Sequence, residues 1–130
     1  MNPNANLELK TIKALAGKHS SRLFNAGDVI FCDGDPGNTL FGVVNGQIQI
    51  STNQEQTEII EPGSCFGAAA LVEPEHRRFG TATALTDVEL LEMNREEFLF
   101  AMQELPMFGL ELLHDLETRL QRLKSRIGGS

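Results

Sequence analysis

The chain has 130 residues, a size typical of one domain, and its hydrophobic content of 41%, with eight Phe, is enough to form a core. The formal net charge of -7 argues against a nucleic-acid-binding surface, because phosphate contacts need clustered Lys and Arg. The start, MNPNANLELK, lacks the apolar core of a signal peptide, and no apolar run reaches membrane-spanning length. A cytoplasmic protein without membrane contact is therefore expected.

Metal and redox chemistry are not indicated by the cysteines and histidines. Cys32 and Cys65 are expected to be reduced thiols in the core. The three histidines, His19, His76 and His114, are scattered and have no metal-ligand spacing to the cysteines. An enzyme with a metal site would need two or three histidines and a carboxylate that converge, so an enzyme is not expected.

The first predicted element is a short helix over residues 6–18. Leu7, Ile12, Leu15 and Ala16 recur there at roughly helical spacing, which predicts one apolar helix face.

Residues 22–93 are expected to form β-structure. The turn signals NAGD, DGDPGN, NG and EPGS separate the short apolar or alternating runs VIFC, TLFGVV, QIQIS, TEIIE and TATALTDVELLEM. The alternation in QIQI places Ile48 and Ile50 on one face, and Asn45-Gly46 predicts a hairpin between two strands. Many short strands between glycine turns indicate a sandwich, barrel or jelly roll.

Two helices are predicted over residues 94–127. Asn94 and Glu97 have the spacing of a capping box at the start of the first helix. Pro106 ends that helix and suits the first turn of the second, which is long.

The long helix carries apolar residues that alternate by three and four, as in the seam of a coiled coil. These residues are Leu113, Leu116, Leu120, Leu123 and Ile127. The seam either packs on the β-structure of its own chain or pairs with a second copy to make a homodimer. Leu110 and Leu112 widen the stripe, so that one side can face the β-structure while the other faces a partner.

This arrangement resembles the cyclic nucleotide-binding domain of the family that includes the catabolite activator protein and the Crp-Fnr-like sensors. The likeness rests on FNAGDVIFCDGD, LFGVVNGQIQI, EPGSCFG and TALTDVELLEMNREEF, with glycines where the family places its turns. It implies a mainly β fold: an antiparallel jelly roll with a short N-terminal helix and two C-terminal helices. It also implies that residues 1–130 form a single domain.

By this resemblance, CFGAAALVEPEHRRFG, residues 65–80, is the phosphate-binding cassette. In the family, a Phe-Gly pair opens a helical turn whose amides face the cyclic phosphate. A glutamate accepts from the ribose 2′-hydroxyl, and an arginine binds the phosphate. Phe66-Gly67 matches, and Arg78 stands at the family's distance, with Arg77 as the alternative.

Two positions depart from the family pattern. Ala68 replaces the glutamate, and an unpaired buried hydroxyl costs about 1–3 kcal/mol, or roughly ten- to a hundredfold in affinity. Phe79 replaces a Ser or Ala, so that a ring either crowds the anion or fills the vacant pocket.

The resemblance also implies ligand contacts outside the cassette. Arg119 matches a ligand-facing arginine, with solvated helix surface as the alternative, while Leu123 replaces a threonine that reads the base. The full set of predicted binding residues is Ile50, Gly67, Ala68, Ala69, Arg78, Phe79 and Arg119.

The expected function is a regulatory sensor module that binds a cyclic nucleotide weakly, or another small effector, and passes the signal through its long helix. Cyclic AMP and cyclic GMP are the candidate ligands, with neither certain. The alternative is a ligand-free β-roll that serves dimerisation or protein docking. The family's usual C-terminal helix-turn-helix is not in this sequence, so these residues are not expected to contact DNA. Either the protein acts without its own DNA reader, or the sequence is one domain of a larger regulator.

Overall fold

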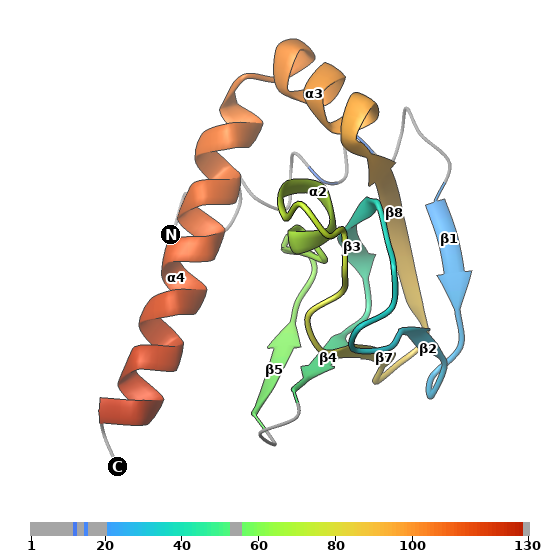
Figure 1. The fold of residues 1–130 in the computed structure, drawn as a ribbon, viewed down its shortest axis with the longest axis vertical. Helices are drawn as coiled ribbons and strands as arrows, with labels where there is room; N and C mark the ends of the chain where they lie inside the picture. The colour runs from blue at the N-terminus through green and yellow to red at the C-terminus, as the bar shows by residue number, and fades with distance from the viewer. Residues whose placement is uncertain (1–11, 13–14, 16–20, 53–55, 129–130) are drawn as a thin grey trace.

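The computed structural model describes residues 12, 15, 21–52 and 56–128. Two four-stranded antiparallel sheets, in the strand orders β1-β8-β3-β6 and β2-β7-β4-β5, form the β-roll (Figure 1). The strands are β1 (Ser21–Phe24), β2 (Val29–Phe31), β3 (Thr39–Asn45), β4 (Ile48–Ser51), β5 (Thr57–Ile60), β6 (Cys65–Phe66), β7 (Thr81–Ala84) and β8 (Val88–Asn94). The predicted antiparallel jelly roll is confirmed.

The space between the two sheets is filled by side chains from both. Phe31, Phe41 and Phe66 form an aromatic cluster there, with ring centroids 5.2 Å apart for Phe41 and Phe66 and 6.0 Å apart for Phe31 and Phe66. Ile48 is fully buried beside them, and Ile50 packs against the same cluster. The predicted shared face of Ile48 and Ile50 is therefore confirmed.

The predicted hairpin at Asn45-Gly46 is wrong. These residues connect β3 to β4, and the two strands belong to different sheets. The turn forms a corner of the roll, and Gly46 adopts a φ of 88° there. A Cβ at Gly46 would collide with the carbonyl oxygen of Asp87 in the neighbouring turn. The glycine therefore allows the two turns to lie close together.

The run TATALTDVELLEM forms two strands, not one. β7 and β8 lie in different sheets, and the chain turns between them at residues 85–87. Asp87 accepts a hydrogen bond from the Ala26 amide at 2.9 Å, which holds this turn against the loop after β1.

The helices whose bounds are described are α2 (Ala69–Val72), α3 (Arg95–Glu104) and α4 (Met107–Gly128). The predicted capping box of α3 is confirmed, because Asn94 Oδ1 accepts from the Glu97 amide and Glu97 Oε1 accepts from the Asn94 amide, both at 2.9 Å. The predicted helix over residues 6–18 lies mostly outside the described residues. Ile12 and Leu15 are helical and buried.

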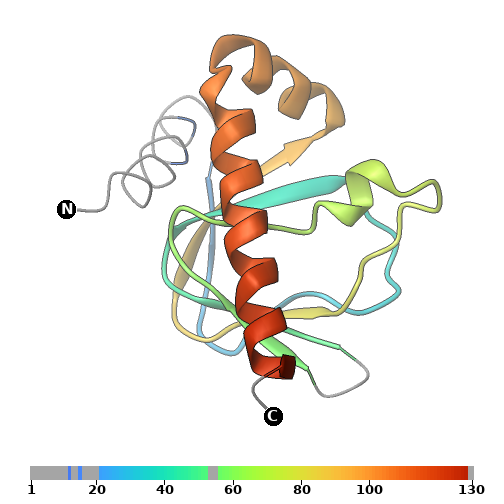
Figure 2. The ribbon, with the colours of Figure 1, turned by 90° about the vertical axis from the view of Figure 1, so that its left-hand side faces the viewer.

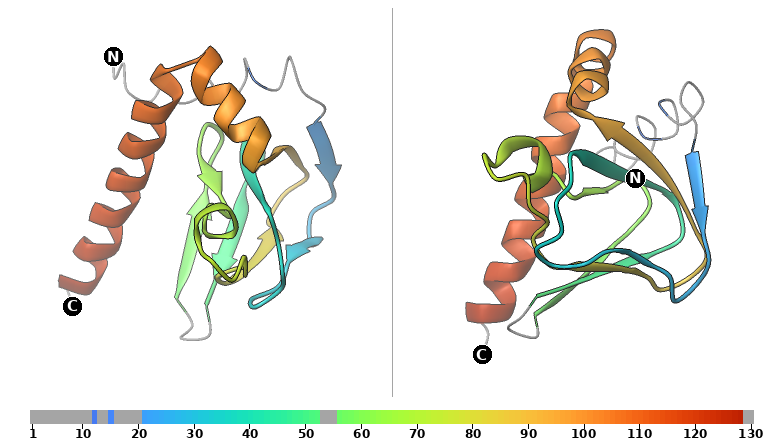
Figure 3. Two further views of the ribbon diagram at one scale, coloured as in Figure 1. Left: turned by 45° about the horizontal axis from the view of Figure 1, so that its top comes forward. Right: turned by 45° about the vertical axis from the view of Figure 1, so that its right-hand side comes forward.

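The long helix α4 lies along one side of the roll, next to β5 and opposite β1 (Figures 1 and 3). It runs from α3 at one end toward the β4–β5 end at the other (Figure 2). Its buried face holds Phe108, Glu111 and Asp115, whereas Leu113 is 63% exposed. The helix therefore presents a partly polar face to its own domain and keeps apolar residues on the outside.

The cysteines differ in environment. Cys65 is buried in the core as predicted, but the core position predicted for Cys32 is wrong. β2 ends at Phe31, and the Cys32 amide donates to Asp35 Oδ2 at 2.9 Å, which places Cys32 in an exposed turn.

The described residues include no group of His, Cys, Asp and Glu side chains placed to hold a metal ion. None of the described helices is long and apolar enough to cross a membrane.

Candidate functional site

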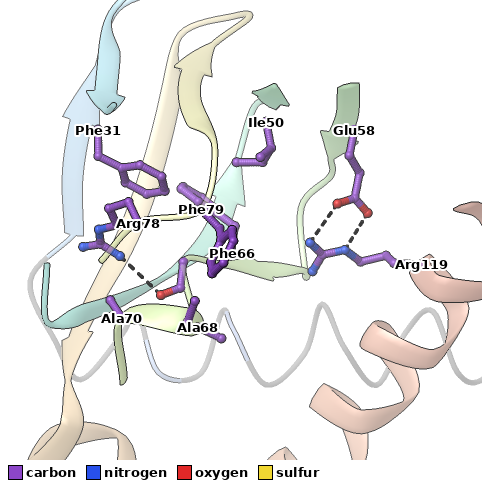
Figure 4. Close-up of a pocket in the computed structure, with 11 residues that line it drawn as sticks. Phe31, Ile50, Glu58, Phe66, Ala68, Ala70, Arg78, Phe79 and Arg119 are labelled. Atoms are coloured by element: carbon purple, nitrogen blue, oxygen red, sulfur yellow. Dashed lines mark hydrogen bonds and ion pairs between the residues drawn. The ribbon is translucent and has the colours of Figure 1, made fainter. Parts of the chain in front are cut away.

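A cavity of about 190 Å³ opens between the cassette, the sheet β2-β7-β4-β5 and α4 (Figure 4). Every residue of the predicted binding set lines it. The lining residues are Phe31, Ile50, Glu58, Phe66, Gly67, Ala68, Ala69, Ala70, Arg78, Phe79 and Arg119. Aromatic and aliphatic side chains form most of the wall, and Glu58, Arg78 and Arg119 supply the polar groups.

The local backbone explains how the cassette frames this cavity. β6 ends at Phe66, and Gly67 turns the chain with a φ of 83°. A Cβ on Gly67 would lie 2.8 Å from Arg78 Nη1, so glycine also makes room for the arginine. The loop after α2 folds back, with His76 Nδ1 in a hydrogen bond to the Ala70 carbonyl at 2.8 Å.

Arg78 is only 6% exposed, and several contacts with the surrounding protein hold its guanidinium. Its Nη1 donates to the carbonyl oxygens of Thr39 and Gly67 at 2.6 and 3.2 Å, and its Nη2 donates to Thr39 Oγ1 at 3.0 Å. The guanidinium carbon lies 4.4 Å from the centroid of the Phe31 ring. Burial lowers the pKa of Arg78, while attraction to Glu92 and Asp35 opposes that shift.

Arg77 is separate from the cavity. Its side chain is exposed and is absent from the cavity lining, and its Nη1 donates to the Gly34 carbonyl at 2.9 Å. Of the two candidates, Arg78 is the arginine that the structure brings to the cavity.

Arg119 connects α4 to the β-roll and is not solvated helix surface. Its side chain is 14% exposed, with Nε and Nη2 donating to the Glu58 carboxylate at 2.8 and 3.1 Å. Its Nη1 donates to the Cys65 carbonyl at 2.6 Å and to Asp115 at 3.3 Å. Burial by itself would lower the pKa of Arg119, but its contacts with Glu58 and Asp115 raise it overall. Its charge is thus compensated by two carboxylates.

Glu58 was missed by the sequence reasoning. The signal was present, because Glu58 and Ile60 are two residues apart in a strand and so share the face that points inward. Leu123, in contrast, is half-buried on α4 and does not line the cavity.

Phe79 does not fill the cavity. Its side chain is 74% exposed at the rim, and the cavity remains beneath it. Ala68 contributes only a methyl group where the family pattern has a carboxylate. Pockets that enclose drug-sized ligands measure about 300–1,000 Å³, so this cavity would hold only part of a nucleotide in the observed geometry.

The sequence matches a family model and is similar to several known bacterial regulators. The family model described as "Cyclic nucleotide-binding domain" matches residues 21–104. The chain is 34% identical to the cyclic AMP receptor protein of Thermus thermophilus over 77% of this chain and 48% of that protein. It is 30% identical to the global nitrogen regulator of Synechocystis over 80% of this chain and 49% of that protein. The chain thus spans about half the length of these curated relatives.

A solved structure extends the likeness to three dimensions. The crystal structure of the Thermus thermophilus catabolite activator protein superimposes with a TM-score of 0.66 at 28% identity, covering 98% of this chain and 59% of that one. The fold described above is thus shared with that protein. The chain belongs to the cyclic nucleotide-binding domain family.

Proposed function

We propose that residues 1–130 act as one regulatory sensor domain, which binds a cyclic nucleotide weakly, or another small anionic effector, in the cassette cavity. The signal passes through α4. The observation that carries this proposal is that the cassette, through Arg78, and α4, through Arg119, line the same cavity. A ligand in it touches both the phosphate-binding segment and the helix that reports binding.

The anion belongs at the Arg78 end of the cavity. A guanidinium has five N–H donors, and three hydrogen bonds from Arg78 go to Thr39 and Gly67. The two remaining N–H groups, on Nε and Nη2, have no hydrogen bond to the described residues and lie next to Gly37. The compensated charge of Arg119 makes it a poorer anion site.

Weak binding has two causes in the same cavity. Ala68 offers no acceptor to a ribose hydroxyl, which reduces affinity roughly ten- to a hundredfold. The cavity of about 190 Å³ is also too small to enclose a whole nucleotide without a shift of Phe79 or α4. Cyclic AMP and cyclic GMP remain the first ligands to test, because the matched relative from Thermus is named for cyclic AMP.

Calorimetry with cyclic AMP and cyclic GMP at millimolar concentration tests the proposal. Binding by the wild type is expected to weaken at least about tenfold in Arg78→Lys, which keeps the charge but loses the planar fork of donors. Arg77→Lys is the matched control and is expected to bind like the wild type. If neither ligand gives a heat of binding, the proposal that the cavity binds a cyclic nucleotide is contradicted.

A second candidate function is a ligand-free β-roll used for dimerisation or docking. The exposed leucines of α4 favour it, since Leu113, Leu116 and Leu120 are 63%, 41% and 45% exposed. We propose that two copies pair along the helix seam. The seam residues are Leu113, Leu116, Leu120, Leu123 and Ile127; the side chain of Ile127 lies outside the described residues. Under this candidate, Ala68→Glu combined with Phe79→Ser would restore nucleotide binding.

A further inference from the structure

The cassette cavity has two chemically different ends. Arg78 lies at one end against Phe31, and the Glu58–Arg119 pair lies at the other, with Ile50, Phe66 and Phe79 between them (Figure 4). The first end carries a positive charge. The second end is an ion pair, in which the carboxylate offsets the guanidinium.

Glu58 is the only carboxylate among the described residues that line this cavity. It is held firmly, because both of its oxygens accept from Arg119, at 2.8 and 3.1 Å. A carboxylate has about four acceptor positions, so each oxygen keeps one for a further donor. Its side chain is 23% exposed, which leaves it accessible from the cavity.

Electrostatics then sets the direction in which a ligand binds. An anionic group near Glu58 would be repelled by the carboxylate, whereas Arg78 attracts it. An uncharged O–H or N–H group, in contrast, finds a fixed acceptor at Glu58. A charge-assisted hydrogen bond to a carboxylate is stronger than one between neutral groups.

We propose that Glu58 is the specificity-determining residue of this cavity: its carboxylate, oriented by Arg119, accepts a hydrogen bond from a hydroxyl or amine of a ligand whose anion lies at Arg78. This inference rests on the proposed sensor function and names the ligand class: a small anion that carries an O–H or N–H donor at its opposite end. Glu58 thereby supplies from β5 the acceptor that Ala68 cannot supply from the cassette.

The test is calorimetric binding of cyclic AMP, cyclic GMP and 2′-deoxy cyclic AMP to the full chain and its variants. Glu58→Ala is expected to weaken binding of the preferred nucleotide about tenfold or more. Glu61→Gln, a nearby substitution outside the cavity, is expected to bind like the wild type. If Glu58 binds the ribose hydroxyl, 2′-deoxy cyclic AMP will bind wild type and Glu58→Ala equally. If it binds the base, Glu58→Ala will lose the same affinity for cyclic AMP as for 2′-deoxy cyclic AMP. The loss of affinity will then differ between cyclic AMP and cyclic GMP.

Asp115→Asn tests whether the role of Glu58 is purely structural. This substitution weakens the other side-chain contact of Arg119 and leaves Glu58 in place. The proposal expects this variant to keep the wild-type preference among the three compounds. Equal losses for all three compounds in both variants would overturn the proposal, as would wild-type affinity in Glu58→Ala. A wild type that binds none of the compounds would overturn this inference together with the nucleotide version of the sensor function, whereas unchanged binding in Glu58→Ala would overturn only the inference.

Discussion

At the residue scale, Arg78 lies at the end of a chain of polar contacts that starts at Arg22 on β1. Arg22 donates to Glu92 at 2.7 Å, and the other oxygen of Glu92 accepts from Thr39 Oγ1 at 2.8 Å. Thr39 Oγ1 in turn accepts from Arg78 at 3.0 Å. Three strands thus contribute to the orientation of one guanidinium, so contacts within the protein are enough to hold Arg78 in place.

Removal of the Thr39 hydroxyl should therefore destabilise the fold. In Thr39→Val the buried Arg78 loses one acceptor and Glu92 loses a donor, which costs about 1–3 kcal/mol of unfolding free energy. Urea denaturation measures the change. Thr39→Ser keeps the hydroxyl and is expected to lie close to wild type, so equal losses in Val and Ser would contradict a role for the hydrogen bonds.

At the scale of elements, Arg119 holds α4 against the roll. It connects the helix to β5 through Glu58 and to β6 through the Cys65 carbonyl. Arg126 adds a hydrogen bond to the Thr57 carbonyl at 2.8 Å near the end of the helix. The attachment of α4 in this region is polar, so it can be broken and remade at a smaller cost than an interface of packed apolar side chains.

Arg119→Met should loosen this attachment. The variant keeps most of the side-chain volume but leaves Glu58 and Asp115 without their cation, at a cost of about 3 kcal/mol, the low end for a broken buried pair. The low end applies because Glu58 is 23% exposed. Arg122→Met, an exposed substitution on the same helix, is expected to change stability by less than about 0.5 kcal/mol. Urea denaturation of the two variants decides between a structural attachment and a dispensable contact.

At the scale of the whole molecule, α4 has two faces of different chemistry. One face meets the roll through Phe108, Asp115 and Arg119. The other exposes leucines from Leu110 to Leu120, over about 15 Å of a helix that is about 33 Å long. A ligand that moved α4 on the roll would therefore also move the surface that a second copy would contact. Dimerisation and sensing are compatible in this arrangement.

Leu116→Lys is expected to weaken the proposed dimer at least about tenfold, because it places a charge in an apolar seam. Sedimentation velocity across a concentration series measures the change. Leu23→Lys is the matched control: Leu23 is 79% exposed on β1, on the opposite side of the roll from α4, so this variant should sediment like the wild type. A wild type that sediments as a monomer throughout would contradict the dimer itself.

Features governed by neighbours in the chain could be predicted from the sequence. The Asn94–Glu97 capping box, the shared face of Ile48 and Ile50 and the extent of the long helix follow from local hydrogen bonding and from the period of apolar residues. The family resemblance placed the predicted cassette over residues 65–80 and gave Arg78 as its arginine, with Arg77 as the alternative. These properties depend on a few consecutive residues, so their pattern is written in the sequence.

Only the tertiary structure decided which distant residues meet. Asn45-Gly46 makes a corner between two sheets because β3 and β4 pair with other strands. Glu58 joins Arg119 across 61 positions of sequence, and Arg78 joins Thr39 across 39. Residue types and local periodicity determine which side chains face inward, but the partner of each is set by how sheets and helix pack. For that reason the sequence located seven of the residues that line the cavity, whereas Glu58, its pairing with Arg119 and the two unlike ends of the cavity came from the folded chain.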